Sequence, residues 1–84
     1  MTRFTVVWLK EVQDDLAEIW MTHHDRESVA EAANVIDDSL ASDPWNQGGE
    51  LKEGIRFFLA PPLRVLYSIK EADRIVEVVL VRSI

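Results

Sequence analysis

The fold of this chain is decided by residues 55–70, which read IRFFLAPPLRVLYSIK. Two runs of apolar, β-branched and aromatic residues, Ile55 to Ala60 and Leu63 to Lys70, lie on either side of Pro61-Pro62. A third run, Ile75 to Arg82, follows a polar turn around Glu71-Ala72-Asp73. Such runs are typical of strands, and the short turns between them predict an antiparallel meander of three strands.

The residues before this meander predict a strand and two helices. Arg3 to Leu9 is again β-branched and aromatic, and we expect it to lie beside the last strand. Apolar side chains then recur at helical spacing over residues 10–23 and 25–43, with Asp25 as an N-cap and Asp43-Pro44 as a stop. The loop that follows contains Gly48-Gly49 and is not predicted to form a strand.

The element order is therefore βααβββ in a single domain, residues 1–84. The fold class that it predicts is α+β with two layers, in which an αα-hairpin packs on a four-stranded, mainly antiparallel sheet. A chain of 84 residues has room for one core of this kind and for no second domain.

Composition and charge restrict the partners of this domain. The chain lacks cysteine, which excludes a disulfide framework, and has neither a signal-peptide pattern nor an apolar run long enough to span a membrane, so we expect a cytoplasmic protein. Its net charge of −6 opposes tight unaided binding to nucleic acid. The charge is uneven: residues 1–43 hold 3 basic and 10 acidic side chains, while residues 44–84 hold 6 basic and 5 acidic ones.

The strand register determines which side chains can act together, because a slip by one residue moves a strand's side chains to the other face. We expect Ile55, Phe57 and Leu59 to face the helices, which requires an odd loop with Ala60 opposite Arg64. An even loop after Ile69 then pairs it with Val76 and gives a core of Val76, Val78 and Leu80.

This register places Arg56, Arg64 and Glu77 together on the face away from the helices. Arg56 and Glu77 would meet across the short side chain of Ser68. Two interpretations remain open at this point. The two residues form a surface ion pair of little energetic consequence, or the paired guanidinium groups bind a phosphate or carboxylate.

The order of elements, together with several short motifs, resembles the RelE/ParE toxin superfamily of bacterial type II toxin-antitoxin systems. The similarity spans nearly the whole chain. The matching segments are Val7-Trp8, Asp15-Leu16-Ala17-Glu18-Ile19-Trp20, Asp43-Pro44 followed by Gly48, Gly54-Ile55-Arg56 and Leu63-Arg64-Val65-Leu66-Tyr67-Ser68-Ile69.

The resemblance implies a cytoplasmic toxin-like protein of growth regulation or plasmid stabilization, with a cognate antitoxin as partner and ribosome-bound mRNA or DNA gyrase as target. In the mRNA-cleaving branch, basic residues on the sheet bind the RNA backbone and stabilise the charge that develops on the phosphate. Arg64 and Arg56 match such basic positions. With Glu77 from the register they form the candidate catalytic set, and Lys52, Tyr67 and Arg82 are candidate binding residues.

The sequence departs from that branch after the last strand. Family nucleases continue with a basic or His-containing segment, whereas here Arg82 is followed only by Ser83 and Ile84. We therefore expect binding with little or no cleavage, since general acid-base catalysis contributes ~10²- to 10⁴-fold. The alternative is a degenerate, non-toxic interaction module, which could form a homodimer through a strand edge. We expect no cofactor and no membrane partner, and no metal at His23-His24.

Overall fold

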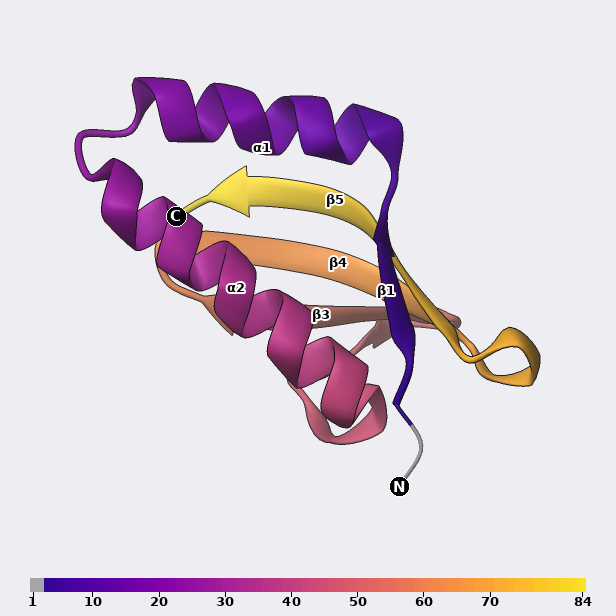
Figure 1. Ribbon diagram of the computed structural model, residues 1–84. Helices are drawn as coiled ribbons and strands as arrows, with labels where there is room; N and C mark the ends of the chain where they lie inside the picture. Colours follow the sequence, from indigo (N-terminus) through magenta and orange to yellow (C-terminus); the bar gives the residue numbers. More distant parts are fainter. Residues whose placement is uncertain (1–2) are drawn as a thin grey trace.

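The computed structural model describes residues 3–84, so the first two residues of the predicted domain lie outside the described part. Two helices and five strands follow one another in the order β1, α1, α2, β2, β3, β4, β5 (Figure 1). Short 3-10 turns follow α2 and β4. The bounds are β1 Thr5–Trp8, α1 Lys10–Thr22, α2 Arg26–Ser42, β2 Gly49–Lys52, β3 Ile55–Ala60, β4 Leu63–Lys70 and β5 Ile75–Ser83.

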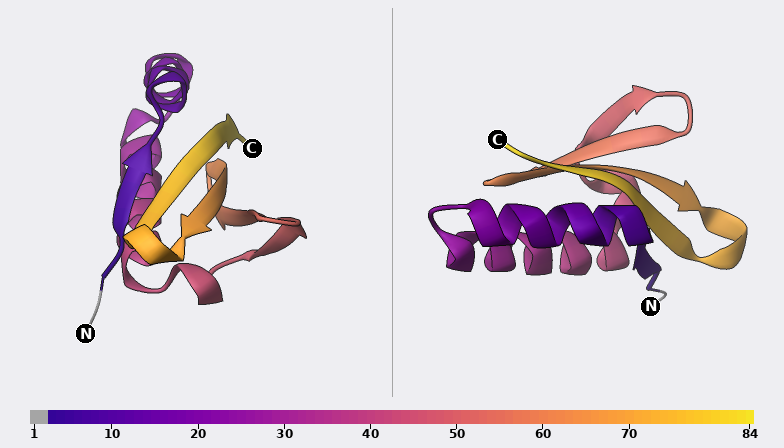
Figure 2. Two further views of the ribbon diagram at one scale, coloured as in Figure 1. Left: turned by 90° about the vertical axis from the view of Figure 1, so that its right-hand side faces the viewer. Right: turned by 90° about the horizontal axis from the view of Figure 1, so that it is seen from above.

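The strands form one five-stranded sheet in the order β1-β5-β4-β3-β2. The pair β1 and β5 is parallel, as expected for a first strand that returns beside the last, and the other pairs are antiparallel. Both helices lie on one side of the sheet (Figure 2). The predicted α+β class, with a helix pair on a mainly antiparallel sheet, is confirmed.

The fifth strand, β2, is an addition to the predicted sheet. The start of β2 was expected to be part of a loop over residues 45–50, because Gly48 and Gly49 are adjacent glycines. The structure pairs it with β3, and the left-handed backbone of Gly48 and Gly54 (φ 55° and 80°) turns the chain before and after it.

The two helices begin and end close to the predicted positions. The N-cap of α2 is Asp25, whose carboxylate accepts hydrogen bonds from the Ser28 Oγ (2.7 Å) and backbone N–H (3.1 Å). These bonds, the side-chain one first, lower the pKa of Asp25 below its ordinary value of 3.8. At the other end α2 stops before Asp43 and Pro44. Helix α1 runs along β5, beyond the point where β1 ends, and α2 crosses the sheet (Figure 1).

The core lies between α2 and the sheet. On β4 the side chains of Leu63, Val65 and Tyr67 are fully buried, in the alternation expected of a strand with one covered face. The other large side chains that are fully buried are Val29, Ile36, Leu40, Pro44, Val76, Val78 and Val81. No buried side-chain polar atom in residues 3–84 lacks a hydrogen-bond partner.

The register predicted between β3 and β4 is wrong. Pro61 and Pro62 alone form the loop, so Ala60 pairs with Leu63 and Leu59 pairs with Arg64. The preference of two-residue hairpin loops for glycine-rich turns argued against this loop, but it does not extend to a turn built around a cis X–Pro peptide, which joins Pro61 to Pro62 here.

This one-residue difference exchanges the faces of β3. Arg56, Phe58 and Ala60 face the helices, and Leu59, which we expected in the core, is 49% exposed.

The register predicted between β4 and β5 is correct near the turn and wrong beyond it. Ile69 pairs with Val76, and Ser68 with Glu77, as expected. A bulge then shifts the pairing, since Tyr67 lies opposite Val78 and Leu66 opposite Leu80. The extra residue on β5 turns Val81 into the core in place of the predicted Leu80.

Candidate functional site

Arg64 and Arg82 lie side by side on the open face of the sheet, the face turned away from the helices. The two residues are direct cross-strand partners on β4 and β5. On the other side of Arg64, its partner on β3 is the exposed Leu59. Leu66 and Leu80 form the next cross-strand pair on the same face. We call Arg64 and Arg82 the arginine row.

The two guanidinium groups of the arginine row have different surroundings. Nη1 of Arg82 is 3.7 Å from the Asp15 carboxylate of α1 and donates a hydrogen bond to the Val81 carbonyl (2.7 Å). Arg64 is exposed, and none of the ion pairs within residues 3–84 includes it. Two positive charges in adjacent cross-strand positions repel each other, which makes this row a site that an anion would stabilise.

Arg56 lies on the opposite face from Arg64, so the predicted grouping of these two arginines is wrong. Its Nε donates to the Tyr67 hydroxyl (3.3 Å), and its Nη2 donates to the carbonyls of Trp45 (2.9 Å) and Gln47 (3.2 Å). The guanidinium also stacks over the Trp45 ring, 5.9 Å from its centroid. Arg56 therefore fastens the loop after α2 to the sheet.

Tyr67 takes part in the same fastening from inside the core. Its ring is fully buried, and its hydroxyl lies 2.8 Å from the Pro44 carbonyl and 3.0 Å from that of Gln47, to which it can donate. The same oxygen accepts from Arg56. A fully buried hydroxyl with partners of this kind holds the loop in place, and the predicted role of Tyr67 in binding does not fit its burial.

Glu77 and Lys52 lie away from the arginine row. The predicted contact between Glu77 and Arg56 is wrong, because Arg56 points to the other face and Glu77 lies 3.8 Å from the Lys70 ammonium. Lys52 is exposed at the end of β2, opposite Ile55. Of the six predicted site residues, the sheet thus brings together Arg64 and Arg82.

An apolar groove lies between α1, α2 and β1, on the side of the molecule that the sequence did not single out. Its volume is about 730 Å³, and Trp20 on its wall is 42% exposed. The lining residues include Trp8, Leu16, Ala17, Trp20, Ala30 and Ala33. The sequence signal for the groove is the small size of Ala17, Ala30 and Ala33, which leave space beside Trp8 and Trp20.

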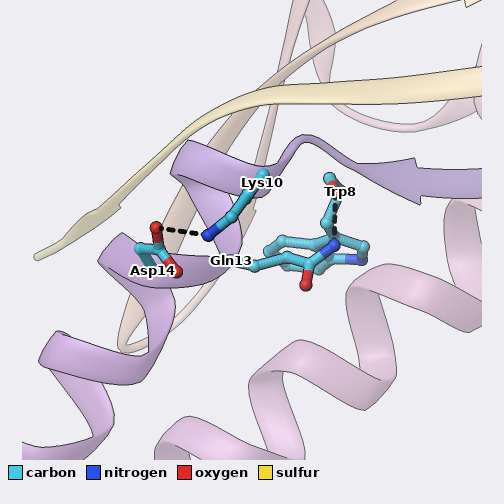
Figure 3. A network of polar contacts seen from close by, with 4 residues as sticks. All are labelled: Trp8, Lys10, Gln13 and Asp14. Atoms are coloured by element: carbon cyan, nitrogen blue, oxygen red, sulfur yellow. Dashed lines mark hydrogen bonds and ion pairs between the residues drawn. The ribbon is translucent and has the colours of Figure 1, made fainter.

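Polar contacts hold one end of this groove in place. The Trp8 indole Nε1 donates to Asp37 on α2 (2.6 Å), and Gln13 donates from its side chain to the Trp8 carbonyl (2.7 Å; Figure 3). Asp37 is the only charged residue that lines the described groove, and it is acidic. These contacts anchor β1 to both helices at this end of the groove.

The histidines form a separate pair at the turn between the helices. The rings of His23 and His24 stack with centroids 4.5 Å apart. Within the part of the chain that the structure describes, no three His, Cys, Asp or Glu side chains are grouped closely enough to hold a metal ion. In residues 3–84 neither helix is long and apolar enough to cross a membrane.

The architecture defines a class: a helix pair on a mainly antiparallel sheet whose first and last strands are parallel. No family model matches the sequence, and no curated protein matches it. Among solved structures, a chain of the RelBE2 toxin-antitoxin complex from Mycobacterium tuberculosis superposes with a TM-score of 0.82 at 20% identity, covering 100% of this chain and 94% of that one. A chain of the chromosomal ParDE toxin-antitoxin system from P. aeruginosa gives 0.68 at 14% identity, covering 96% of each.

At such identities the likeness is one of fold. The RelE/ParE fold indicated by the sequence motifs is confirmed over the whole described chain.

Proposed function

We propose that this chain is a toxin-like protein of a type II toxin-antitoxin system that works by binding partners. The observation that carries the proposal is the RelE/ParE fold of the whole described chain. An open apolar groove between its helices gives a partner a place to bind. An apolar groove between two helices can accept the apolar face of an amphipathic segment.

The groove is the site that we assign to the antitoxin. An amphipathic segment laid between α1 and α2 would bury the exposed face of Trp20 and the small residues Ala17, Ala30 and Ala33. Residues 1–43, which form both helices, carry a balance of 3 basic and 10 acidic side chains. The complementary segment therefore carries basic residues beside its apolar ones.

The arginine row is the site that we assign to the cellular target. The two targets implied by the fold resemblance are ribosome-bound mRNA and DNA gyrase, and two arginines in directly paired cross-strand positions favour a ligand rich in phosphate. The chain's two histidines, His23 and His24, lie at the turn between the helices and not on the open face. The open face thus offers no histidine for acid-base catalysis, which supports binding over cleavage.

The antitoxin site is tested with a matched pair of arginine substitutions on α2. Ala30 is exposed and lines the groove, whereas Asn34 is exposed on the same helix and does not. The partner to use is a small protein encoded beside this chain, co-expressed with it and captured through a tag. Ala30→Arg should abolish capture, because it fills the groove and adds a charge there, and Asn34→Arg should leave capture unchanged. Equal capture by all three proteins would contradict this assignment.

The alternative function, a non-toxic interaction module, makes a different prediction. Under that alternative the folded chain leaves growth unchanged when its expression is induced, and a homodimer formed through a strand edge elutes at twice the mass of 9.6 kDa.

A further inference from the structure

The arginine row has an internal acidic neighbour. Asp15 on α1 lies beside Arg82, and both residues line a cavity of about 400 Å³ between α1 and β5. Neither side chain is deeply buried, with about half of each exposed (53% for Arg82 and 52% for Asp15).

Helix α1 holds this carboxylate at the edge of β5. Val12, three residues before Asp15, is buried against the core, and Ile19, four residues after it, packs partly there too. Residues three and four apart share one face of a helix, so the packing of Val12 and Ile19 turns Asp15 towards β5. The next residue back, Asp14, points elsewhere and pairs with Lys10 (3.4 Å; Figure 3).

Arg82 is consequently drawn away from Arg64. Its guanidinium contacts Asp15 and the Val81 carbonyl, although its backbone is paired directly with that of Arg64. A phosphate group that binds both arginines competes with Asp15 for the Arg82 guanidinium, whose Nη1 faces that carboxylate.

We propose that Asp15 masks Arg82, and that a phosphate of a single-stranded RNA displaces this carboxylate when it binds across Arg64 and Arg82. This inference rests on the proposed target site. The mask lowers the affinity of the isolated chain for RNA and is a specificity device, because only a ligand that engages both arginines compensates for the lost ion pair. Leu66 and Leu80, paired across β4 and β5, lie beside the row on the same face.

The test compares two neighbouring substitutions that change the net charge equally. Asp15→Asn removes the mask, and Asp14→Asn, which alters a carboxylate paired with Lys10, is the control. Both positions are exposed, so both variants should fold. Binding of a fluorescein-labelled RNA dodecamer is followed by anisotropy at low salt. We expect Asp15→Asn to bind about two- to fivefold more tightly than the wild type, the range of an exposed ion pair.

Each outcome decides between mechanisms. The gain should disappear on the Arg82→Ala background, where Asp15 has nothing to mask. An equal gain in both Asn variants would overturn the mask, because a general change of charge would then explain it. Unchanged affinity in Asp15→Asn, with binding lost in Arg64→Ala, would overturn the mask and leave the target site standing. Absence of RNA binding in every variant, Asp15→Asn included, would overturn both.

Discussion

The role of Arg56 depends on which face of the sheet its side chain occupies. On the open face it could bind a ligand, and on the helix face it can hold a loop. The sequence resemblance assigned Arg56 to a basic position on the open face, yet the structure turns it towards the helices. There it meets Tyr67 and two loop carbonyls. A guanidinium with three such partners is already engaged, so the contribution of Arg56 is to hold the loop of Trp45 and Gln47 against the sheet.

The fastening predicts the effect of removing one buried hydroxyl. Tyr67→Phe removes the hydrogen bonds to Pro44 and Gln47 and leaves Arg56 with fewer acceptors, so we expect a loss of about 1–3 kcal/mol in the free energy of unfolding. Urea unfolding measures it. Ser68→Ala, one residue along on the open face, is the control and should change stability by less than ~0.5 kcal/mol. If Tyr67→Phe were as stable to urea as Ser68→Ala, the hydrogen bonds of the Tyr67 hydroxyl would contribute nothing to the free energy of unfolding.

At the scale of elements, local signals were sufficient to place the helices and four strands. The Asp25 cap, the Asp43-Pro44 stop and the apolar runs are readable because they depend on near neighbours. The pairing of the strands depends on turn geometry and on the bulge at Leu66 and Tyr67. No residue pattern in the sequence predicts this bulge. For this reason the predicted grouping of Arg56 with Arg64 was wrong, and the direct pairing of Arg64 with Arg82 was not predicted, because the expected register set Arg64 opposite Val81.

The cap of α2 predicts a particular dependence of stability on pH. The folded pKa of Asp25 is lowered by Ser28, so the cap stabilises the folded state above the ordinary value of 3.8 and loses this effect as the pH falls through the folded pKa. Asp25→Ala should therefore be less stable than the wild type near neutrality, and the difference should shrink below about pH 4. Thermal unfolding followed across this range measures the difference, and a gap that stays constant would exclude an ionised cap.

The two glycines that border the β2–β3 hairpin predict effects of different size. Both have positive φ, which costs an L-residue about 1–2 kcal/mol. A Cβ on Gly54 would meet open space, whereas one on Gly48 would lie 1.7 Å from the Phe57 carbonyl oxygen. Gly54→Ala should lose about that amount of stability and keep β2. Gly48→Ala should lose clearly more, with faster amide exchange in β2. Equal losses would mean that the close approach to Phe57 relaxes freely.

At the scale of the whole molecule, the net charge of −6 is the sum of two different surfaces. The acidic excess belongs to the helical half, whose groove suits a basic, amphipathic segment, while the open face of the sheet carries the arginine row. Composition and sequence order predicted this division of charge. They did not predict the groove, because its walls come from β1, α1 and α2 together. Trp20 is also of a residue type that usually packs in a core, and its exposure is not readable from the sequence.

Growth after induced expression is the most direct measurement of whether this chain is a toxin-like protein that acts through its open face. Wild-type expression should arrest growth within a few generations, and Arg64→Ala, an exposed substitution that leaves the core intact, should restore it. Arrest by the wild type together with relief by Arg64→Ala is the predicted result. Normal growth in cells that accumulate the folded wild-type chain would contradict the account.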